Sequence, residues 1–209
     1  MDAAARMLMA GLATAGALSP PAEAQPQEIR RGAQDEAGTR AVIETLSARL
    51  LAAPSATAVL EAWCAERGLA ADPRIVAIRV PDIDKPPSPL QRERLAVGPD
   101  EAVRYRRVRL ACGSHVLSEA DNWYVPGRLT PEMNAALDGT QAPFGRVVRP
   151  LNPSRRNLSL RMLWRPGEGI APGPDAPLFS VEAVLSTGGV PFCEVAETYT
   201  GAVLARGER

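Results

Sequence analysis

The chain has 209 residues, enough for one compact domain with its own core, and its 24 basic and 24 acidic side chains give no net charge. A neutral chain gives no electrostatic reason to expect nucleic acid or an anionic membrane surface as a partner. Aromatic residues make up only 4% of the chain and prolines number 20, so we expect a core of Leu, Val, Ile and Ala with many irregular connections.

The first 24 residues have the pattern of a secretory signal peptide. Arg6 precedes an apolar stretch of small residues at 7–18, and the Ala-Glu-Ala sequence at 22–24 has the form of a signal-peptidase site. The apolar stretch is too short to anchor the protein in a bilayer. We therefore predict a periplasmic or secreted protein with no membrane span after cleavage. The alternative is a disordered, alanine-rich terminus on a cytoplasmic protein, because Asp2 weakens the positive charge before the apolar stretch.

A linker and a first helix are predicted next. Residues 25–39 are polar and rich in Gly, Ala and Gln, and we interpret them as a linker to a single domain at 40–209. Apolar residues three and four positions apart predict a helix over 40–51, which ends before Pro54.

A second helix, a short strand and a long loop follow. The helix is predicted from residue 55 or 57 to residue 67, with Gly68 as its stop and with Leu60, Trp63 and Cys64 buried. The apolar run at 75–80 predicts a strand. Residues 81–99 carry five prolines and predict a long loop that could act as a flap over a site.

Residues 103–148 hold the clearest patterns of the chain. Two runs rich in β-branched and aromatic residues flank Gly113-Ser114 and predict a β-hairpin. Thr130-Pro131-Glu132 supplies an N-cap hydroxyl, a proline at the first helical position and an acid in the first turn, so a short helix is predicted to run from there to Gly139. A further strand is predicted over 143–148.

The C-terminal part predicts a second hairpin. Residues 150–177 contain several arginines, but only 158–164 has the pattern of an ordered element, and the pattern does not fix its type. Strands are predicted over 178–185 and 190–199, with Gly188-Gly189 as the turn. Helices come first and hairpin-linked strands later, which predicts an α+β fold with an antiparallel sheet covered on one face by helices.

The three cysteines, Cys64, Cys112 and Cys193, lie far apart without a Cys-x-x-Cys pair. This spacing indicates neither a zinc site nor a thioredoxin-like motif. In an exported protein one pair could be oxidised, which would leave one thiol. We favour the simpler interpretation of three small buried hydrophobic residues.

The last strand and the first hairpin strand carry the candidate binding residues. Alternation places Glu197 on a partly apolar side of its strand, where a carboxylate is costly unless a cation or hydrogen-bond donors meet it. Arg107 and Arg109 share a face of the earlier strand, and an arginine fork suits a carboxylate on a ligand. The alternative, which spacing alone favours, is a solvated strand face at 104–109 and an ordinary surface ion pair at Glu197.

Other familiar sites are not indicated. His115 is the only histidine, which excludes metal sites built from several imidazoles, and it lies beside a predicted turn rather than near a serine elbow. Neither a dinucleotide fingerprint nor a phosphate loop is present. We therefore expect no metal and no cofactor.

The order and spacing of several motifs resemble the chorismate–pyruvate lyase family. The motifs cover about residues 55–204 and are Arg107-Val108-Arg109-Leu110, the strand at 117–125, the helix at 130–137, Thr140-x-x-Pro143-Phe144-Gly145-Arg146, and Pro191 with Glu197 six residues on. Members of that family cleave chorismate to 4-hydroxybenzoate and pyruvate without a cofactor. The resemblance implies an antiparallel sheet of about six strands, with helices on one side and a buried ligand cavity under flaps.

The resemblance also implies roles for single residues. Arg107 would hold the ring carboxylate of the substrate, and Phe144 would offer a backbone N–H to the ligand. Glu197 would donate the proton that assists loss of the enolpyruvyl group. Asn122 stands about where a bacterial lyase has a second ligand arginine, and Arg149 or Arg161 would have to replace it.

Two functions are therefore carried forward. The first is a chorismate lyase-like enzyme acting on a small aromatic or cyclic carboxylate, as a monomer. Chorismate is a cytosolic metabolite, however, and export would separate the protein from it. The alternative is an exported, non-catalytic binding module on the same fold, comparable to the effector-binding domains of some bacterial transcription regulators. A third possibility, a structural protein, predicts that Arg107 and Glu197 lie apart and solvated, whereas both ligand hypotheses require them on one face of the sheet.

Overall fold

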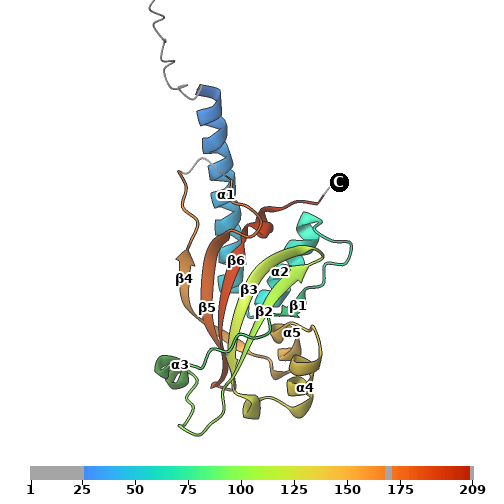
Figure 1. Ribbon diagram of the computed structural model, residues 1–209, viewed down its shortest axis with the longest axis vertical. Helices are drawn as coiled ribbons and strands as arrows, with labels where there is room; N and C mark the ends of the chain where they lie inside the picture. The colour runs from blue at the N-terminus through green and yellow to red at the C-terminus, as the bar shows by residue number, and fades with distance from the viewer. Residues whose placement is uncertain (1–25, 168–170, 208–209) are drawn as a thin grey trace, which may run out of the picture.

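The computed structural model describes residues 26–167 and 171–207, which form one antiparallel sheet with helices packed on it (Figure 1). The strands are β1 Val76–Arg79, β2 Arg104–Cys112, β3 His115–Tyr124, β4 Ser154–Met162, β5 Pro177–Thr187 and β6 Val190–Thr200. Their order across the sheet is β1-β2-β3-β6-β5-β4, and each neighbouring pair is antiparallel. The predicted α+β fold is confirmed.

Four helices pack on one side of this sheet, which we call the inner face. They are α1 Pro26–Ala52, α2 Ala56–Arg67, α4 Pro131–Gly139 and α5 Phe144–Val147. The buried side chains of α1 and α2 form one cluster with strand residues that include Val108, Val181 and Val195. Residues of α4 and α5 form a second cluster with Tyr124 and Phe192. The core therefore lies between the sheet and these four helices.

The opposite side of the sheet, which we call the outer face, is covered in part by the proline-rich segment. This segment contains a short helix, α3 Pro89–Arg94, which begins at a capping box on Ser88. Leu95 packs against Trp123 on the outer face, and Arg94 pairs with Glu194 at 3.1 Å. The predicted flap at 81–99 thus contains a helix and packs on the outer face.

Cap residues fix the helix ends where the sequence predicts them. The Ser55 hydroxyl accepts from the Ala58 N–H at the start of α2, and Gly68 ends the helix at a φ of 63°, a conformation that favours glycine. The Thr130 hydroxyl accepts from the Met133 N–H at 3.2 Å and starts α4. Both helices and both predicted hairpins are confirmed.

Two local predictions are wrong. The stretch predicted as a linker is helical from Pro26, because a proline suits a first helical turn and the next proline is Pro54. Residues 143–148, predicted as a strand, contain α5: Phe144 and Val148 lie four residues apart and both point into the core. The undecided element at 158–164 lies mostly in strand β4, and the predicted signal peptide at 1–24 lies outside the described residues.

The cysteines divide into a bonded pair and a free thiol. Cys64 of α2 and Cys112 of β2 form a disulfide with a Cα–Cα distance of 6.2 Å, which ties α2 to the sheet. Cys193 is free and buried, and burial, with nearby Glu197, raises the pKa of its thiol well above the ordinary value. The interpretation of three unpaired cysteines is therefore wrong for the first two. Among the described residues, no helix combines the length and apolarity that crossing a bilayer requires.

Candidate functional site

Arg107 and Glu197 lie on opposite faces of the sheet. Across the strands Val108 is opposite Ala120, which in turn is opposite Glu197, so these three side chains share the inner face. Arg107 is opposite Asp121 and points to the outer face. The interpretation that Arg107 holds a ligand beside Glu197 is therefore wrong, because a shift of one residue along a strand reverses the face. Both ligand hypotheses fail in the form that pairs these two residues, and a ligand site at Glu197 needs a different cation.

The arginines of the outer face are paired with carboxylates. Arg107 donates to Glu119 at 2.5 Å and lies 3.7 Å from Asp121, and Arg109 donates to Glu119 at 3.0 Å. The Tyr105 hydroxyl donates to Asp121, and burial, followed by that hydrogen bond, raises the pKa of Tyr105 to about 12. These pairs are partly solvated, so we interpret them as a structural network and not as a ligand site.

Glu197 and Phe144 line a cavity between the inner face and the helices α2 and α5. Its volume is ≈ 40 Å³, room for about three water molecules. Most of the wall is apolar. It comes from β2, β3, β5 and β6 and, on the opposite side, from the segments at 54–57 and 144–148 and from Pro153. The polar lining residues are Ser55, Thr57, Asn122, Arg155 and Glu197.

The charged groups of this cavity form a buried ion pair. Arg155 Nη2 donates to Glu197 Oε2 at 2.9 Å, and the two side chains are only 4% and 6% exposed. The Tyr199 hydroxyl donates to the same carboxylate oxygen at 3.2 Å. Burial, the largest single effect, acts to lower the pKa of Arg155, but the charges of Glu197 and Tyr199 and the hydrogen bond to Glu197 together outweigh it, so the pKa is raised. Burial, and then Glu197, raise the pKa of Tyr199 well above its ordinary value, so its hydroxyl stays a donor.

Arg155 retains donor capacity for a ligand. Its Nε donates to Asn157 Oδ1 at 3.2 Å and its Nη2 to Glu197, while Nη1 donates to no other residue in the described ranges. Nearby, the Asn122 amide makes only a long hydrogen bond of 3.4 Å to the Arg106 carbonyl. The cavity therefore offers one guanidinium edge, one amide and the hydroxyls at the start of α2.

The other predicted site residues lie outside this cavity. Arg109 is 53% exposed on the outer face, and Arg149 is exposed in the 3₁₀ turn Arg149–Leu151. Arg155, which sequence reasoning missed, is one of the arginines of residues 150–177 and lies before 158–164, in a part for which no ordered element was predicted. The signal that could have found it is Glu197 itself, since a carboxylate on an inner face requires a cation. Within the described ranges, no three side chains of His, Cys, Asp or Glu gather as metal ligands.

Gly145 allows α5 to approach α2 beside the cavity. A Cβ atom at this position would lie 2.8 Å from Thr57 Oγ1 and 3.3 Å from Ser55 Oγ. We expect Gly145→Ala to lower the free energy of unfolding by about 1–3 kcal/mol through overpacking, as measured by chemical denaturation. Gly139→Ala is the matched control, since nothing lies within 4 Å of a Cβ there. Equal effects of the two variants would show that the contact with α2 is not tight.

Comparison with known proteins places the fold. PhnF from Mycobacterium smegmatis superposes with a TM-score of 0.50 at 14% identity, over 72% of this chain and 65% of the regulator. The isolated effector domain of the same protein gives 0.49 at 16% identity, over 71% of this chain and 89% of that domain. The chain thus has the chorismate lyase-like fold of regulator effector domains. It spans less than two thirds of that PhnF chain.

Sequence comparison gives the family. No protein-family model matches the chain. A protein of Sinorhizobium fredii, named "Uncharacterized protein y4mC", is 48% identical over a 179-residue alignment, and the match covers 78% of this chain and 76% of that protein. The chain therefore belongs to the same protein family as y4mC of Sinorhizobium fredii.

Proposed function

We propose that the protein is a non-catalytic binding module for a small carboxylate, held in the inner-face cavity with Arg155 as the cation. The observation that carries this proposal is a buried arginine with one free nitrogen in a mostly apolar cavity. A guanidinium matches a carboxylate in charge and in planar geometry. The likeness of the fold to a regulator effector domain supports binding as the role.

The size and lining of the cavity bear on the ligand. A volume of ≈ 40 Å³ is far below the roughly 300–1,000 Å³ of pockets for drug-sized ligands. Acetate is close to this size, whereas pyruvate needs some widening of the cavity and an aromatic acid requires the wall to move outward. Phe144 offers a ring to stack on, and its helix α5 is only four residues long, so this part of the wall is the easiest to displace.

The contacts of Glu197 favour binding over lyase chemistry. A general acid must hold a proton and face the leaving group. Glu197 instead accepts hydrogen bonds from both Arg155 and Tyr199 on one oxygen. The arginine that the lyase resemblance requires, Arg107, is engaged with Glu119 on the other face. These contacts suit a Glu197 that holds Arg155 in place for a ligand better than a Glu197 that acts as a general acid.

The test is thermal unfolding of the full chain with acetate, pyruvate, benzoate and 4-hydroxybenzoate, beside the neutral 4-hydroxybenzamide. At a ligand concentration 100 times the Kd, we expect a stabilisation of about 2.7 kcal/mol, which raises Tm by roughly 5–10 °C. The amide, which lacks the charge, should have no comparable effect. Stabilisation by benzoate and 4-hydroxybenzoate as well as by the two smaller acids would show that the cavity wall moves outward to admit an aromatic ring.

Variants assign the effect to the cavity. The double variant Arg155→Met/Glu197→Leu should abolish the shift, whereas Arg156→Met, on the exposed side of the same strand, should retain it. Arg107→Gln should also retain it, since Arg107 lies on the other face. The proposal fails if no carboxylate shifts Tm, or if chorismate incubated with the protein yields 4-hydroxybenzoate in a reaction that Glu197→Gln abolishes.

A further inference from the structure

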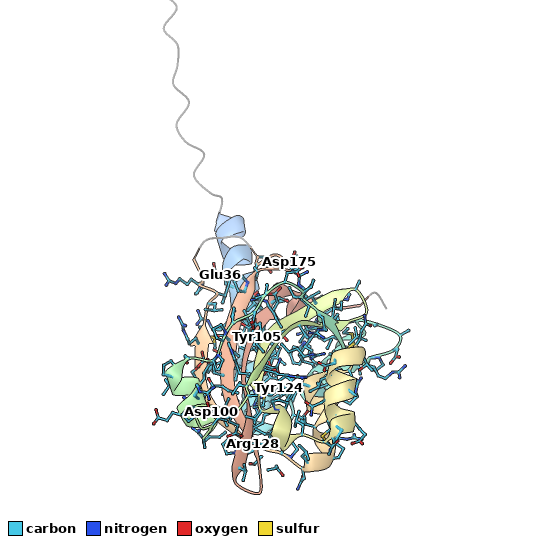
Figure 2. All side chains as sticks on the ribbon, turned by 60° about the horizontal axis from the view of Figure 1, so that its bottom comes forward. Glu36, Asp100, Tyr105, Tyr124, Arg128 and Asp175 are labelled. Carbon is cyan, nitrogen blue, oxygen red and sulfur yellow. A yellow bond between two sulfur atoms is a disulfide. The ribbon has the colours of Figure 1, made fainter. Side chains whose placement is uncertain are left out.

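A second pocket, which we call the arginine pocket, lies at the edge of the inner face near β1. Its volume is ≈ 500 Å³, and three of its lining residues are Arg79, Arg104 and Arg106. Tyr124, which Figure 2 labels on the side of the sheet where α4 lies, borders it too. Its size falls in the range of small-molecule sites, and none of these residues lines the cavity of Arg155 and Glu197.

Arg106 is the unusual member of this pocket. It is only 3% exposed, and its Nε and Nη1 atoms are buried with no hydrogen-bond partner. It forms no ion pair with any residue that the structure describes. A buried charge without a counter-charge is costly, by several kcal/mol in general. Burial, and then the charge of Arg79, lower the pKa of Arg106, as expected of a cation without a close anion.

The neighbouring groups do not satisfy Arg106. Its Nη2 donates to the Ala142 carbonyl at 3.3 Å, a long contact just after the end of α4. The two carboxylates of the pocket are exposed, and one of them, Asp138, pairs with Arg104 at 3.1 Å. The other, Asp84, makes no ion pair with a described residue. Three arginines against two carboxylates leave a net positive charge in the pocket.

We propose that the arginine pocket binds a small oxyanion, phosphate or carboxylate, with Arg106 as its principal ligand and Arg79 beside it. An oxyanion would supply the acceptor that the Nε and Nη1 donors lack, and charged hydrogen bonds of this kind are the strong ones. The Arg79 guanidinium makes only one long hydrogen bond, of 3.4 Å to the Asp138 carbonyl, and can turn to the same anion. This site is independent of the carboxylate site at Arg155.

The wall of the pocket suggests how the anion reaches Arg106. Asp84 belongs to residues 80–88, which have no helix or strand and join β1 to α3. This segment is held by Lys85, which pairs with Asp121 at 2.8 Å, and by the Lys85 carbonyl, which accepts from Trp123 at 2.8 Å. An anion in the pocket would be repelled by Asp84, which is exposed and makes no ion pair with a described residue, so Asp84 can turn away into solvent when the anion binds.

The test is calorimetric titration of the full chain with inorganic phosphate, and separately with acetate, at constant ionic strength. We expect saturable binding of at least one anion that persists in Arg155→Met/Glu197→Leu, in which the other carboxylate site is removed, and the anion that still binds there identifies the ligand chemistry of the arginine pocket. Arg106→Met should weaken this binding about 10- to 100-fold, the effect of losing a charged hydrogen bond. Without anion, Arg106→Met should unfold at the same temperature as the parent or higher, because an unpaired buried charge is gone.

Two controls separate this site from other effects. Arg109→Gln, on the same strand but on the outer face, should leave anion binding unchanged. Arg155→Met/Glu197→Leu removes the other carboxylate site, so anion binding that persists in this variant belongs to the arginine pocket. If Arg106→Met does not fold, Arg79→Gln on the edge strand serves instead and should weaken binding at least several-fold. The proposal is overturned if neither anion binds Arg155→Met/Glu197→Leu saturably, or if Arg106→Met or Arg79→Gln, folded and added to that double variant, leaves the remaining binding as tight as before.

Discussion

Reduction of the Cys64–Cys112 disulfide is expected to lower the free energy of unfolding by about 4 kcal/mol. The bond closes a loop of 48 residues, and the loss of chain entropy in the unfolded state gives this magnitude for a loop of that length. The loop contains the whole of β1 and most of β2, together with the proline-rich segment between them. Without the bond, α2 is held on the sheet by packing and by hydrogen bonds such as the one from the Ile75 N–H to Glu61.

The measurement is chemical denaturation with and without reductant, beside the double variant Cys64→Ala/Cys112→Ala. Reductant should destabilise the parent and leave the double variant unaffected. Cys193→Ala serves as the matched control: its buried thiol is unpaired, so the variant should lose the same stability on reduction as the parent. Thiol titration of the unfolded, unreduced chain should find one of the three cysteines. Three reactive thiols at that step would contradict the bond.

The bond also bears on where the protein works. Disulfides persist in oxidising compartments and are rare in the bacterial cytoplasm. The bond therefore fits the export that the apolar stretch at 7–18 suggests. Export stays a prediction, since residues 1–24 lie outside the described part of the chain.

The fold could be predicted in large part because its local signals act over short distances. Ser55 and Gly68 cap α2, Thr130 and Pro131 start α4, and the glycine turn at 188–189 closes a hairpin. Each of these acts through backbone geometry that one or two residues determine. The strand predicted over residues 143–148 is wrong because a short apolar run fits a strand or a buried helical turn equally well.

The site was less predictable because it depends on which strands are neighbours. Alternation correctly places Glu197 on a partly apolar side and Arg107 with Arg109 on one face. It cannot say whether two distant strands point those faces the same way, since a change of one residue in register reverses the answer. The cation that meets Glu197 comes from β4, two strands away, and the sequence of that region did not reveal its strand. The pairing of Arg155 with Glu197 is therefore a property of sheet order.

Removal of Arg155 alone is expected to be strongly destabilising. Arg155→Met would leave Glu197 buried without its cation, which costs about 3–5 kcal/mol in comparable buried pairs. Arg156→Met on the same strand removes the same charge from an exposed position and should change stability by less than about 0.5 kcal/mol. Chemical denaturation of the two variants separates the buried pair from the general effect of losing one arginine.

The double variant Arg155→Met/Glu197→Leu decides why the pair is there. Replacing both members of a buried pair with apolar residues is often neutral or stabilising, so the double variant should recover most of the stability that Arg155→Met loses. If it does, while carboxylate binding stays abolished, the pair contributes to ligand recognition and little to folding. If the double variant is as unstable as the single one, the pair is needed to hold β4 and β6 in place, and the cavity is a consequence of packing. The two outcomes differ by several kcal/mol and cannot be confused.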